Sequence, residues 1–431
     1  MKIRKFTYGL LLTLALPLTA CRDDADDLMQ PGALQGETLT SQFDQIWQGI
    51  NQNYVFWEID PVDWDAVYAQ YKPKIEELDK QDVVKTSDLK KLYEEAFGQL
   101  IDHHMLIKAV NIKAAPDDEQ IMYVQPGFLE AGNREGFHEP IPVIGFQIIR
   151  QRMKEDGRIT FWHKYVDEDP EASLSHLETC VIDNDILYLS FRAFNIIGKI
   201  QSYIFTGDEN AKDIYDVYSA YMRQLLFNKN IKSIIVDVRS NGGGDLGDML
   251  TVLSPLLKED VHIFDSKTKM GPGRLDYGEW TPWNGKAATQ RQMGELLDWE
   301  EELPDKDCIG DRQVVFLIDC RSVSMAEMST TGAKSLPYAT VIGERSFGGL
   351  GPLTSDVHNS FCGQFGDVNL KSKSYYVYTS TWITRTSEGE YLEGIGVEPD
   401  ITVPLDIEML TGQHIDNQLE YAIDYLHGKQ R

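Results

Sequence analysis

The sequence lacks several patterns by which common active sites are recognised. It contains no Cys-x-x-Cys and no His-Glu-x-x-His, so a metal site has no sequence support. It contains no Gly-x-Ser-x-Gly, which argues against a lipase or esterase of the α/β-hydrolase type. Basic residues are scarce, since 41 Lys and Arg stand against 68 Asp and Glu. The resulting net charge of −27 argues against nucleic-acid binding and for an acidic surface.

A long hydrophobic run is also missing, even at the N-terminus. Residues 1–20 begin with basic residues and continue with an apolar stretch from Gly9 to Leu18, too short for a membrane span. The sequence ending at Cys21, Leu-Thr-Ala-Cys, resembles a bacterial lipobox. This implies removal of residues 1–20 and lipid attachment at Cys21; an ordinary secreted protein is the alternative.

The segment after Cys21 bears on location. Residues 22–27 read Arg-Asp-Asp-Ala-Asp-Asp and resemble the acidic tether that sends some Gram-negative lipoproteins to the outer face of the outer membrane. A solvated spacer is the structural alternative. We expect a protein that is lipid-anchored in the outer membrane, on its periplasmic or cell-surface side, with the surface favoured by the tether.

Cysteine is rare, and four residues remain besides Cys21. These four allow three disulfide pairings, and the sequence does not choose among them: Cys180, Cys308, Cys320 and Cys362. Cys320 ends an apolar run and is equally compatible with a small buried hydrophobic residue.

The chain is long enough for two domains with a large core, having 431 residues of which 42% are hydrophobic. An acidic linker at 21–40 precedes an N-terminal domain, 41–110, in which apolar residues recur at helical spacing. Residues 111–182 are predicted to form a β-rich connection. Within it, the segments on either side of Asp156-Gly157 are expected to pair as a hairpin.

From 183 to 410, apolar strand-like runs alternate with helical stripes. This alternation predicts an α/β domain with mostly parallel strands, followed by a C-terminal helix in 411–431. The stretch 267–307 looks like an insertion whose tryptophans pack it down: Trp280, Trp283 and Trp299.

One serine stands at a strand-to-helix corner. An apolar strand from Val314 to Ile318 is followed by a polar corner, a helix from Met325, and a further strand. Ser324 is therefore placed at a helix N-terminus, where free N–H groups favour developing negative charge. Ser324 to Glu327 also fit a capping box, which would explain this serine without any chemistry.

Three segments in order resemble the carboxyl-terminal processing (tail-specific) peptidases. They are IIVDVRSNGGGDLGDM, then SVSMAE followed by ATVIGERSFGG, then EYLEGIGVEPDITV, and together they cover about 185–405. The resemblance implies a crotonase/ClpP-like α/β spiral and serine peptidase activity on peptides or unfolded proteins, with no cofactor. In many relatives the slot at 111–182 holds a PDZ domain, but no carboxylate-binding loop is evident here and none is assigned.

The resemblance also implies catalytic residues. Bacterial members carry a lysine base after their Gly-Glu-x-Thr-x-Gly strand, but residues 346–351 contain none, which excludes a Ser/Lys dyad there. The segment Leu-Ile-Asp-His-His-Met resembles the histidine segment of the tricorn-like branch and implies His104 as base. His103 occupies a position that is often small and polar. Glu393 falls on the family's motif acid.

The implied mechanism is acyl transfer by Ser324, with His104 taking its proton and Glu393 supporting the histidine. The oxyanion is assigned to the amides of Gly243, or alternatively Gly244, and Met325. Supporting roles fall to His103, Asn241 and Gly244, and the reserve candidates are Asp356 and His358.

Two other functions stay open. A peptide-binding surface lipoprotein that has lost catalysis would fit the missing lysine. A dinucleotide enzyme would use Gly242–Gly247 as a Gly-x-Gly-x-x-Gly loop and Asp265 as the ribose-binding acid, although the first glycine follows its strand at an unusual distance.

Overall fold

The computed structural model describes residues 37–167, 176–353 and 361–429. Cys21, its tether, Asp356 and His358 lie outside the described residues. Among the described residues, every helix is too short or too polar to cross a lipid bilayer.

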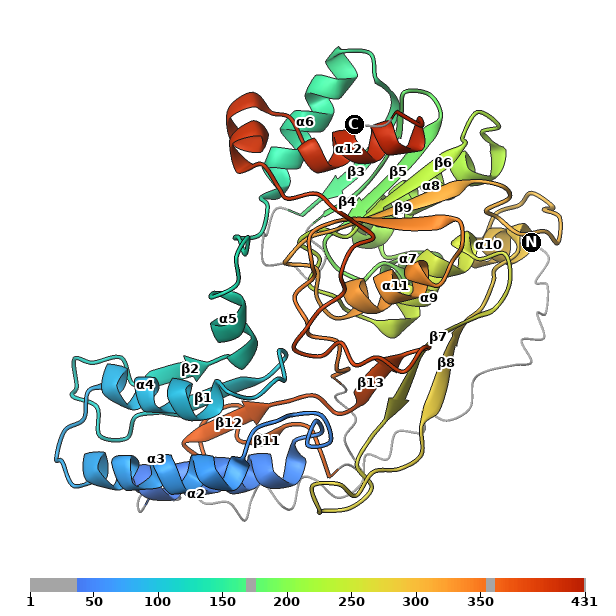
Figure 1. Ribbon diagram of the computed structural model, residues 1–431. Helices are drawn as coiled ribbons and strands as arrows, with labels where there is room; N and C mark the ends of the chain where they lie inside the picture. Colours follow the sequence, from blue (N-terminus) through green and yellow to red (C-terminus); the bar gives the residue numbers. More distant parts are fainter. Residues whose placement is uncertain (1–36, 168–175, 354–360, 430–431) are drawn as a thin grey trace.

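A seven-stranded sheet lies in the upper part of the molecule as drawn in Figure 1. Its order is β14 (Ile401–Thr402), β10 (Ala339–Gly343), β9 (Gln313–Ile318), β6 (Ser233–Asp237), β5 (Ile186–Phe191), β4 (His176–Ile182) and β3 (Ile159–Val166). From β14 to β5 all neighbours are parallel, whereas β5, β4 and β3 are antiparallel. The predicted α/β domain with mostly parallel strands is confirmed.

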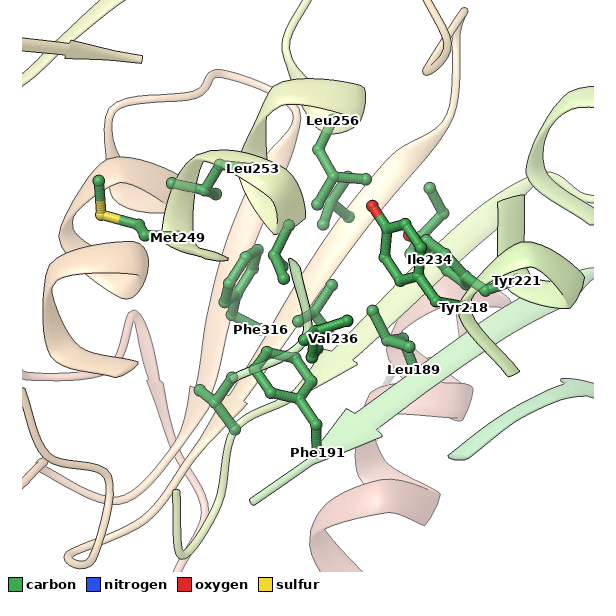
Figure 2. Close-up of a cluster of buried hydrophobic side chains, with 14 of the residues drawn as sticks. Leu189, Phe191, Tyr218, Tyr221, Ile234, Val236, Met249, Leu253, Leu256 and Phe316 are labelled. Atoms are coloured by element: carbon green, nitrogen blue, oxygen red, sulfur yellow. The ribbon is translucent and has the colours of Figure 1, made fainter. Parts of the chain in front are cut away.

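Helices cover both faces of this sheet, because successive side chains of its buried strands alternate between two cores. In β9, for example, Phe316 packs into one core and Leu317 into the other. The first core is covered by α7 (Ile197–Thr206), α8 (Lys212–Phe227), α9 (Leu246–Leu253) and α11 (Met325–Lys334). Figure 2 shows Tyr218, Leu253 and Phe316 in this core. The second core is covered by α6 (Val143–Glu155) and α12 (Asn417–Leu426).

A smaller sheet belongs to the N-terminal part. Its order is β11 (Phe365–Gly366), β12 (Tyr375–Tyr378), β1 (Leu106–Val110) and β2 (Ile121–Val124). It shares a hydrophobic core with α2 (Leu39–Asn53), α3 (Trp64–Asp79) and α4 (Thr86–Phe97). The predicted helical domain at 41–110 thus contributes these three helices and β1, and strands from outside this range complete the sheet. Strands β11 and β12 lie at residues 365–378, far along the chain from β1 and β2, and local patterning does not reveal such pairing.

A third sheet contains part of the predicted insertion. It joins β13 (Ile383–Thr386), β7 (Val261–Lys267) and β8 (Thr281–Gly285), with α10 (Gln290–Leu296) following. The indole N–H of Trp283 donates to Ser266 Oγ (2.7 Å), and that of Trp299 donates to Ser219 Oγ (3.0 Å). These tryptophans hold the insertion onto its neighbours, as expected. The remaining elements are short: α5 (Pro126–Ala131), η1 (Glu209–Ala211), η2 (Ser254–Leu256) and η3 (Met409–Gln413).

The predicted hairpin around Asp156-Gly157 is wrong. Its first half is helix α6, and only its second half, β3, is a strand. The residues of α6 that become buried recur at helical spacing: Phe146, Ile149, Arg150 and Met153. The buried arginine broke the apolar pattern on which the sequence interpretation relied. Arg150 is accommodated because its guanidinium lies against Glu178 (3.3 Å) and over the ring of Tyr188.

None of the three disulfide pairings is formed among the described residues. All four side chains are buried, and they lie in different parts of the fold: Cys180, Cys308, Cys320 and Cys362.

Truncation of a central core residue should destabilise the protein far more than truncation of an exposed one. Leu189 in β5 is fully buried, so Leu189→Ala is expected to lower the free energy of unfolding by about 2–5 kcal/mol. Phe205 in α7 is 78% exposed, so Phe205→Ala is expected to change it by less than about 0.5 kcal/mol. Urea unfolding followed by circular dichroism measures both. Equal effects would contradict the assignment of Leu189 to the core.

Candidate active site

Ser324 occupies a strained corner between β9 and α11. Its backbone has φ 60° and ψ −118°, a conformation that is costly for a residue with a side chain. Its N–H donates to Gly349 O (3.0 Å) and to Glu327 Oε2 (3.1 Å), and the latter bond is part of the anticipated capping box. Strained backbone of this kind persists where surrounding contacts hold it, and it is frequent at active sites.

The glycine loop after β6 lies directly behind this serine. A Cβ added to Gly243 would stand 2.5 Å from Ser324 Cβ and 2.9 Å from its Oγ. The φ of Gly243 is +90°, so both the space and the backbone conformation require glycine. Asn241 ties the loop to the serine corner, because its carbonyl accepts the Val323 N–H (2.9 Å).

The oxyanion donors are arranged differently from the expectation. The Gly243 N–H donates to Asn241 Oδ1 (2.8 Å), so in this structure it is not free to hold an oxyanion. The Asn241 side chain lies two residues back and captures the amide in a tight local turn. Within the described residues, the amides of Met325 and Gly244 donate to no protein acceptor. Of the two glycines, Gly244, the alternative donor, is therefore the one whose amide is not already engaged by a protein acceptor among the described residues.

His104 lies between α4 and β1 and reaches the serine corner from the N-terminal part. A Cβ added to Gly349 would stand 3.3 Å from His104 Nδ1 and 3.4 Å from Val323 Cγ1, so this ring and this side chain meet at Gly349. Nδ1 is buried and has no hydrogen-bond partner among the described residues. Burial, reinforced by neighbouring His103, lowers the pKa of His104 to about 4. The imidazole is neutral at pH 7, as a general base must be.

His103 faces other partners than the serine. Its Nδ1 lies 3.0 Å from Phe347 O, its ring packs edge-on against the ring of Phe347, and its Nε2 lies 3.9 Å from Glu130 Oε2. These contacts fix the segment that carries His104, which suits the supporting role predicted for His103.

Glu393 holds backbone amides rather than the imidazole. Its Oε1 accepts from His103 N (2.9 Å), and its Oε2 accepts from Leu350 N and Gly351 N (2.7 Å each). Burial and the nearby charge of Asp102 raise the pKa of Glu393. Glu393 thus joins the histidine segment to the loop beside the serine.

Asp102 is a functional candidate that the sequence reasoning missed, although it is the aspartate of the same Leu-Ile-Asp-His-His segment. Its carboxylate is fully buried and accepts from His104 N (2.9 Å), Thr379 Oγ1 (2.5 Å) and both N (2.8 Å) and Oγ (3.0 Å) of Ser380. One ligand atom each from Asp102, His104 and Glu393 lies within 4.8 Å of the others. The carboxylate oxygens already accept N–H and O–H donors, whose positive ends would face any metal ion.

One catalytic contact is not made in this structure. Across the described residues, no hydrogen bond joins Ser324 Oγ to the His104 ring, and none joins that ring to Glu393. The fold brings Ser324, His104, Glu393, Gly243 and Met325 into one region, but the hydrogen bond along which a proton would pass from the serine to the histidine is not formed. Catalytic hydrogen bonds are often long without substrate and shorten when it binds.

The glycine loop lacks the geometry of a dinucleotide-binding loop. Residues 238–245 separate β6 from α9, so the crossover is not tight, and Gly243 is packed against Ser324. Asp265 is engaged with Arg385 (3.0 Å) and His262 (2.9 Å) instead of lying beside that loop's helix.

Comparison with known proteins matches two segments to family models. Residues 185–403 match Peptidase family S41, and residues 37–98 match the tricorn protease C1 domain. The nisin-resistance protein of Lactococcus lactis subsp. lactis is 29% identical over 147 residues, which are 33% of this chain and 41% of that protein. This chain therefore matches less than half the length of that relative.

Two solved structures share the fold over nearly the whole chain. A predicted peptidase from Parabacteroides merdae has a TM-score of 0.59 at 18% identity, covering 91% of this chain and 97% of its own. Mature CPAF in complex with lactacystin has a TM-score of 0.52 at 11% identity, covering 94% and 100%. At these identities the likeness concerns the fold.

His104 should remain neutral down to strongly acidic pH. Its pKa of about 4 lies below the ordinary value of 6.5, so its burial contributes stability above about pH 6.5 that is lost as pH falls through about 4. An NMR titration of the histidine side chains should show one imidazole protonating near pH 4 in a still-folded protein. That resonance should be missing in His104→Gln. Titration of His104 near its ordinary pKa would contradict the enclosed environment of its Nδ1.

Proposed function

Because the chain belongs to peptidase family S41, we propose that it is a serine peptidase that cleaves peptides or unfolded proteins through an acyl-enzyme. The observation that carries the proposal is the meeting of three distant stretches at one strained corner: Ser324 at the start of α11, Gly243 behind it and His104 against Gly349. A capping serine alone needs neither the close glycine nor the partly buried, neutral histidine.

The first half of the proposed reaction forms the acyl-enzyme. Ser324 Oγ attacks the carbonyl carbon of the scissile peptide bond while the His104 ring takes the hydroxyl proton. The carbonyl oxygen becomes an oxyanion, which the amides of Met325 and Gly244 stabilise, joined by Gly243 if its N–H leaves Asn241. The C–N bond then breaks, and His104 gives the proton to the leaving amine.

The second half regenerates the serine. Water attacks the acyl carbon, His104 takes the proton of this water, and collapse of the intermediate releases the new carboxyl group with Ser324 reprotonated. Glu393 contributes by holding the His103 amide and the loop amides, so its action on His104 passes through the backbone. The reaction uses no metal ion or organic cofactor.

A second candidate function is supported by a specific observation. The open contact between Ser324 and His104, together with the engaged Gly243 amide, suits a peptide-binding protein that has lost catalysis. Such a protein would bind peptides at the same corner without forming an acyl-enzyme.

Labelling with a fluorophosphonate probe separates the two functions. We expect the wild type to be labelled and Ser324→Ala not to be labelled. We expect His104→Ala to be labelled at least about a hundredfold more slowly than the wild type, because the serine then lacks its base. Circular dichroism checks that both variants are folded. Labelling lost only in Ser324→Ala would indicate another base, while an unlabelled wild type would favour the peptide-binding protein.

The proposed setting is outside the cytoplasm, where the protein acts as a processing peptidase. We propose lipid attachment at Cys21 in the outer membrane, with the acidic residues 22–27 favouring the cell surface. Two anchoring contributions are generally needed for stable membrane attachment, and a bacterial lipoprotein obtains them from several acyl chains.

Replacement of Cys21 should release the protein from the membrane. In cells producing the full chain, Cys21→Ala is expected to move most of the protein from the membrane fraction to the soluble fraction because no acyl chains are attached. Cys320→Ala, which alters a buried thiol, serves as the control and should stay in the membrane fraction. Membrane association unchanged in Cys21→Ala would contradict the anchor.

A further inference from the structure

Glu327 is a fully enclosed acid beside Ser324, and the proposed reaction does not use it. It lies three residues after the serine in α11, and its exposed fraction is 0%. A carboxyl group removed from water is costly unless donors replace the lost water. Its four hydrogen bonds supply those donors.

The donors come from two separate segments. Oε2 accepts from Ser324 N (3.1 Å) and Gly349 N (2.9 Å), and Oε1 accepts from Gly348 N (2.7 Å) and Ser346 Oγ (2.5 Å). Each oxygen therefore accepts two bonds. One carboxylate joins the serine corner to the loop 346–349.

The same loop carries the contact with the histidine. Gly349 O accepts the Ser324 N–H (3.0 Å), and the His104 ring lies against Gly349. A shift of this loop would therefore move Ser324 and His104 relative to each other. Displacements of about 1 Å in a catalytic arrangement are enough to cost about a hundredfold in rate.

We propose that Glu327 is a positioning residue that, in its ionised form, fixes Ser324 and the loop 346–349 in the arrangement that lets His104 activate the serine. This inference rests on the proposed peptidase function. Three of the four donors are backbone amides, which cannot become acceptors. A neutral carboxyl group keeps its contacts only if the Ser346 hydroxyl reverses, while Ser346 Oγ also accepts from Val397 N (2.6 Å).

The surroundings of Glu327 allow its carboxylate to take up a proton close to neutral pH. Burial raises its pKa to about 7, against the opposing effect of its four donors. The charged or titratable groups near it are Glu393 and Arg134, which interact with it electrostatically, and His103 and His104, which touch Gly348 and Gly349. The titration of His104 near pH 4 is well separated from that of Glu327.

Stability and activity should respond to this proton in opposite directions. Because the pKa of Glu327 is raised in the folded protein, its contribution favours the folded state at low pH and is lost as pH rises through about 7. An activity that falls between pH 8 and pH 6 would therefore not be explained by unfolding at this group.

The test is the rate of fluorophosphonate labelling of Ser324 between about pH 5.5 and 8.5, corrected for probe hydrolysis, with thermal unfolding measured alongside. The wild-type rate should fall towards acid with a midpoint near pH 7 in a folded protein. Glu327→Gln should be labelled about tenfold to a hundredfold more slowly than the wild type at pH 8, because its amide N–H₂ opposes the donors. Its labelling rate should also lack the decrease towards acid pH, which we call the acid limb of the profile. A purely structural role would leave the limb in place.

Glu344→Gln is the matched control. Glu344 lies two residues before the loop 346–349 but pairs with His138 (3.1 Å), so its variant should keep the wild-type rate and the wild-type decrease towards acid pH. If Glu327→Gln does not fold, Ser346→Ala takes its place. That variant removes one donor to the carboxylate and should shift the limb to higher pH, and an unshifted limb would overturn the inference.

The outcomes separate the two proposals. Glu327→Gln with the wild-type rate and pH profile would overturn the positioning role and leave the peptidase function intact. A wild type that is not labelled, or a Ser324→Ala variant that is labelled as strongly, would overturn the peptidase function and this inference with it.

Discussion

Two buried carboxylates hold four consecutive backbone amides, and the candidate site depends on this arrangement. Glu327 accepts the amides of Gly348 and Gly349, and Glu393 accepts those of Leu350 and Gly351. Each carboxylate also holds the segment of one proposed catalytic residue, because Glu327 binds the Ser324 amide and Glu393 binds the His103 amide. The loop 348–351 thus connects the proposed nucleophile to the proposed base.

The composition of this loop follows from its geometry. Four amides in succession can face two carboxylates only if the backbone turns tightly and comes close to its neighbours. Gly348 has φ +101°, and a Cβ there would stand 3.0 Å from His103 Nδ1. A Cβ on Gly351 would stand 2.5 Å from Ser380 Oγ and 2.6 Å from the ring of Phe56. Larger side chains would separate the loop from the two segments that it joins.

The parts of the fold that could be predicted are those whose signal is local. Strands β6 and β9 are uninterrupted apolar runs between polar turns, and α8 shows one apolar stripe, so the sequence alone is enough to recognise them. Helix α6 was misread because Arg150 occupies one of its buried positions. The N-terminal sheet was missed because β12 is distant in sequence, and the pattern of residues 106–124 does not indicate that they pair with residues 375–378.

The candidate site divides in the same way. Ser324, His104 and Glu393 were found because they lie in motifs whose residues are close in sequence. The contacts that define their roles were not predictable, since they join residues far apart. Neither the donation from Gly243 to Asn241 nor the four bonds to Glu327 follows from spacing, and Glu327 could be recognised only as a helix cap. The sequence does not indicate that Asp102 is buried, so its motif alone does not mark it as a functional candidate.

The position of the missing lysine now has a physical explanation. Residues 346–351 have no side chain that can act as a base, and their amides are directed to Glu327 and Glu393. A lysine ammonium placed among these amides would face N–H groups of the same polarity and would compete with them for both carboxylates. For the proposed peptidase, the base therefore has to come from another segment of the chain. His104 comes from the N-terminal part, whose sheet is completed by β11 and β12, so the relative placement of the two halves of the molecule determines whether serine and histidine meet.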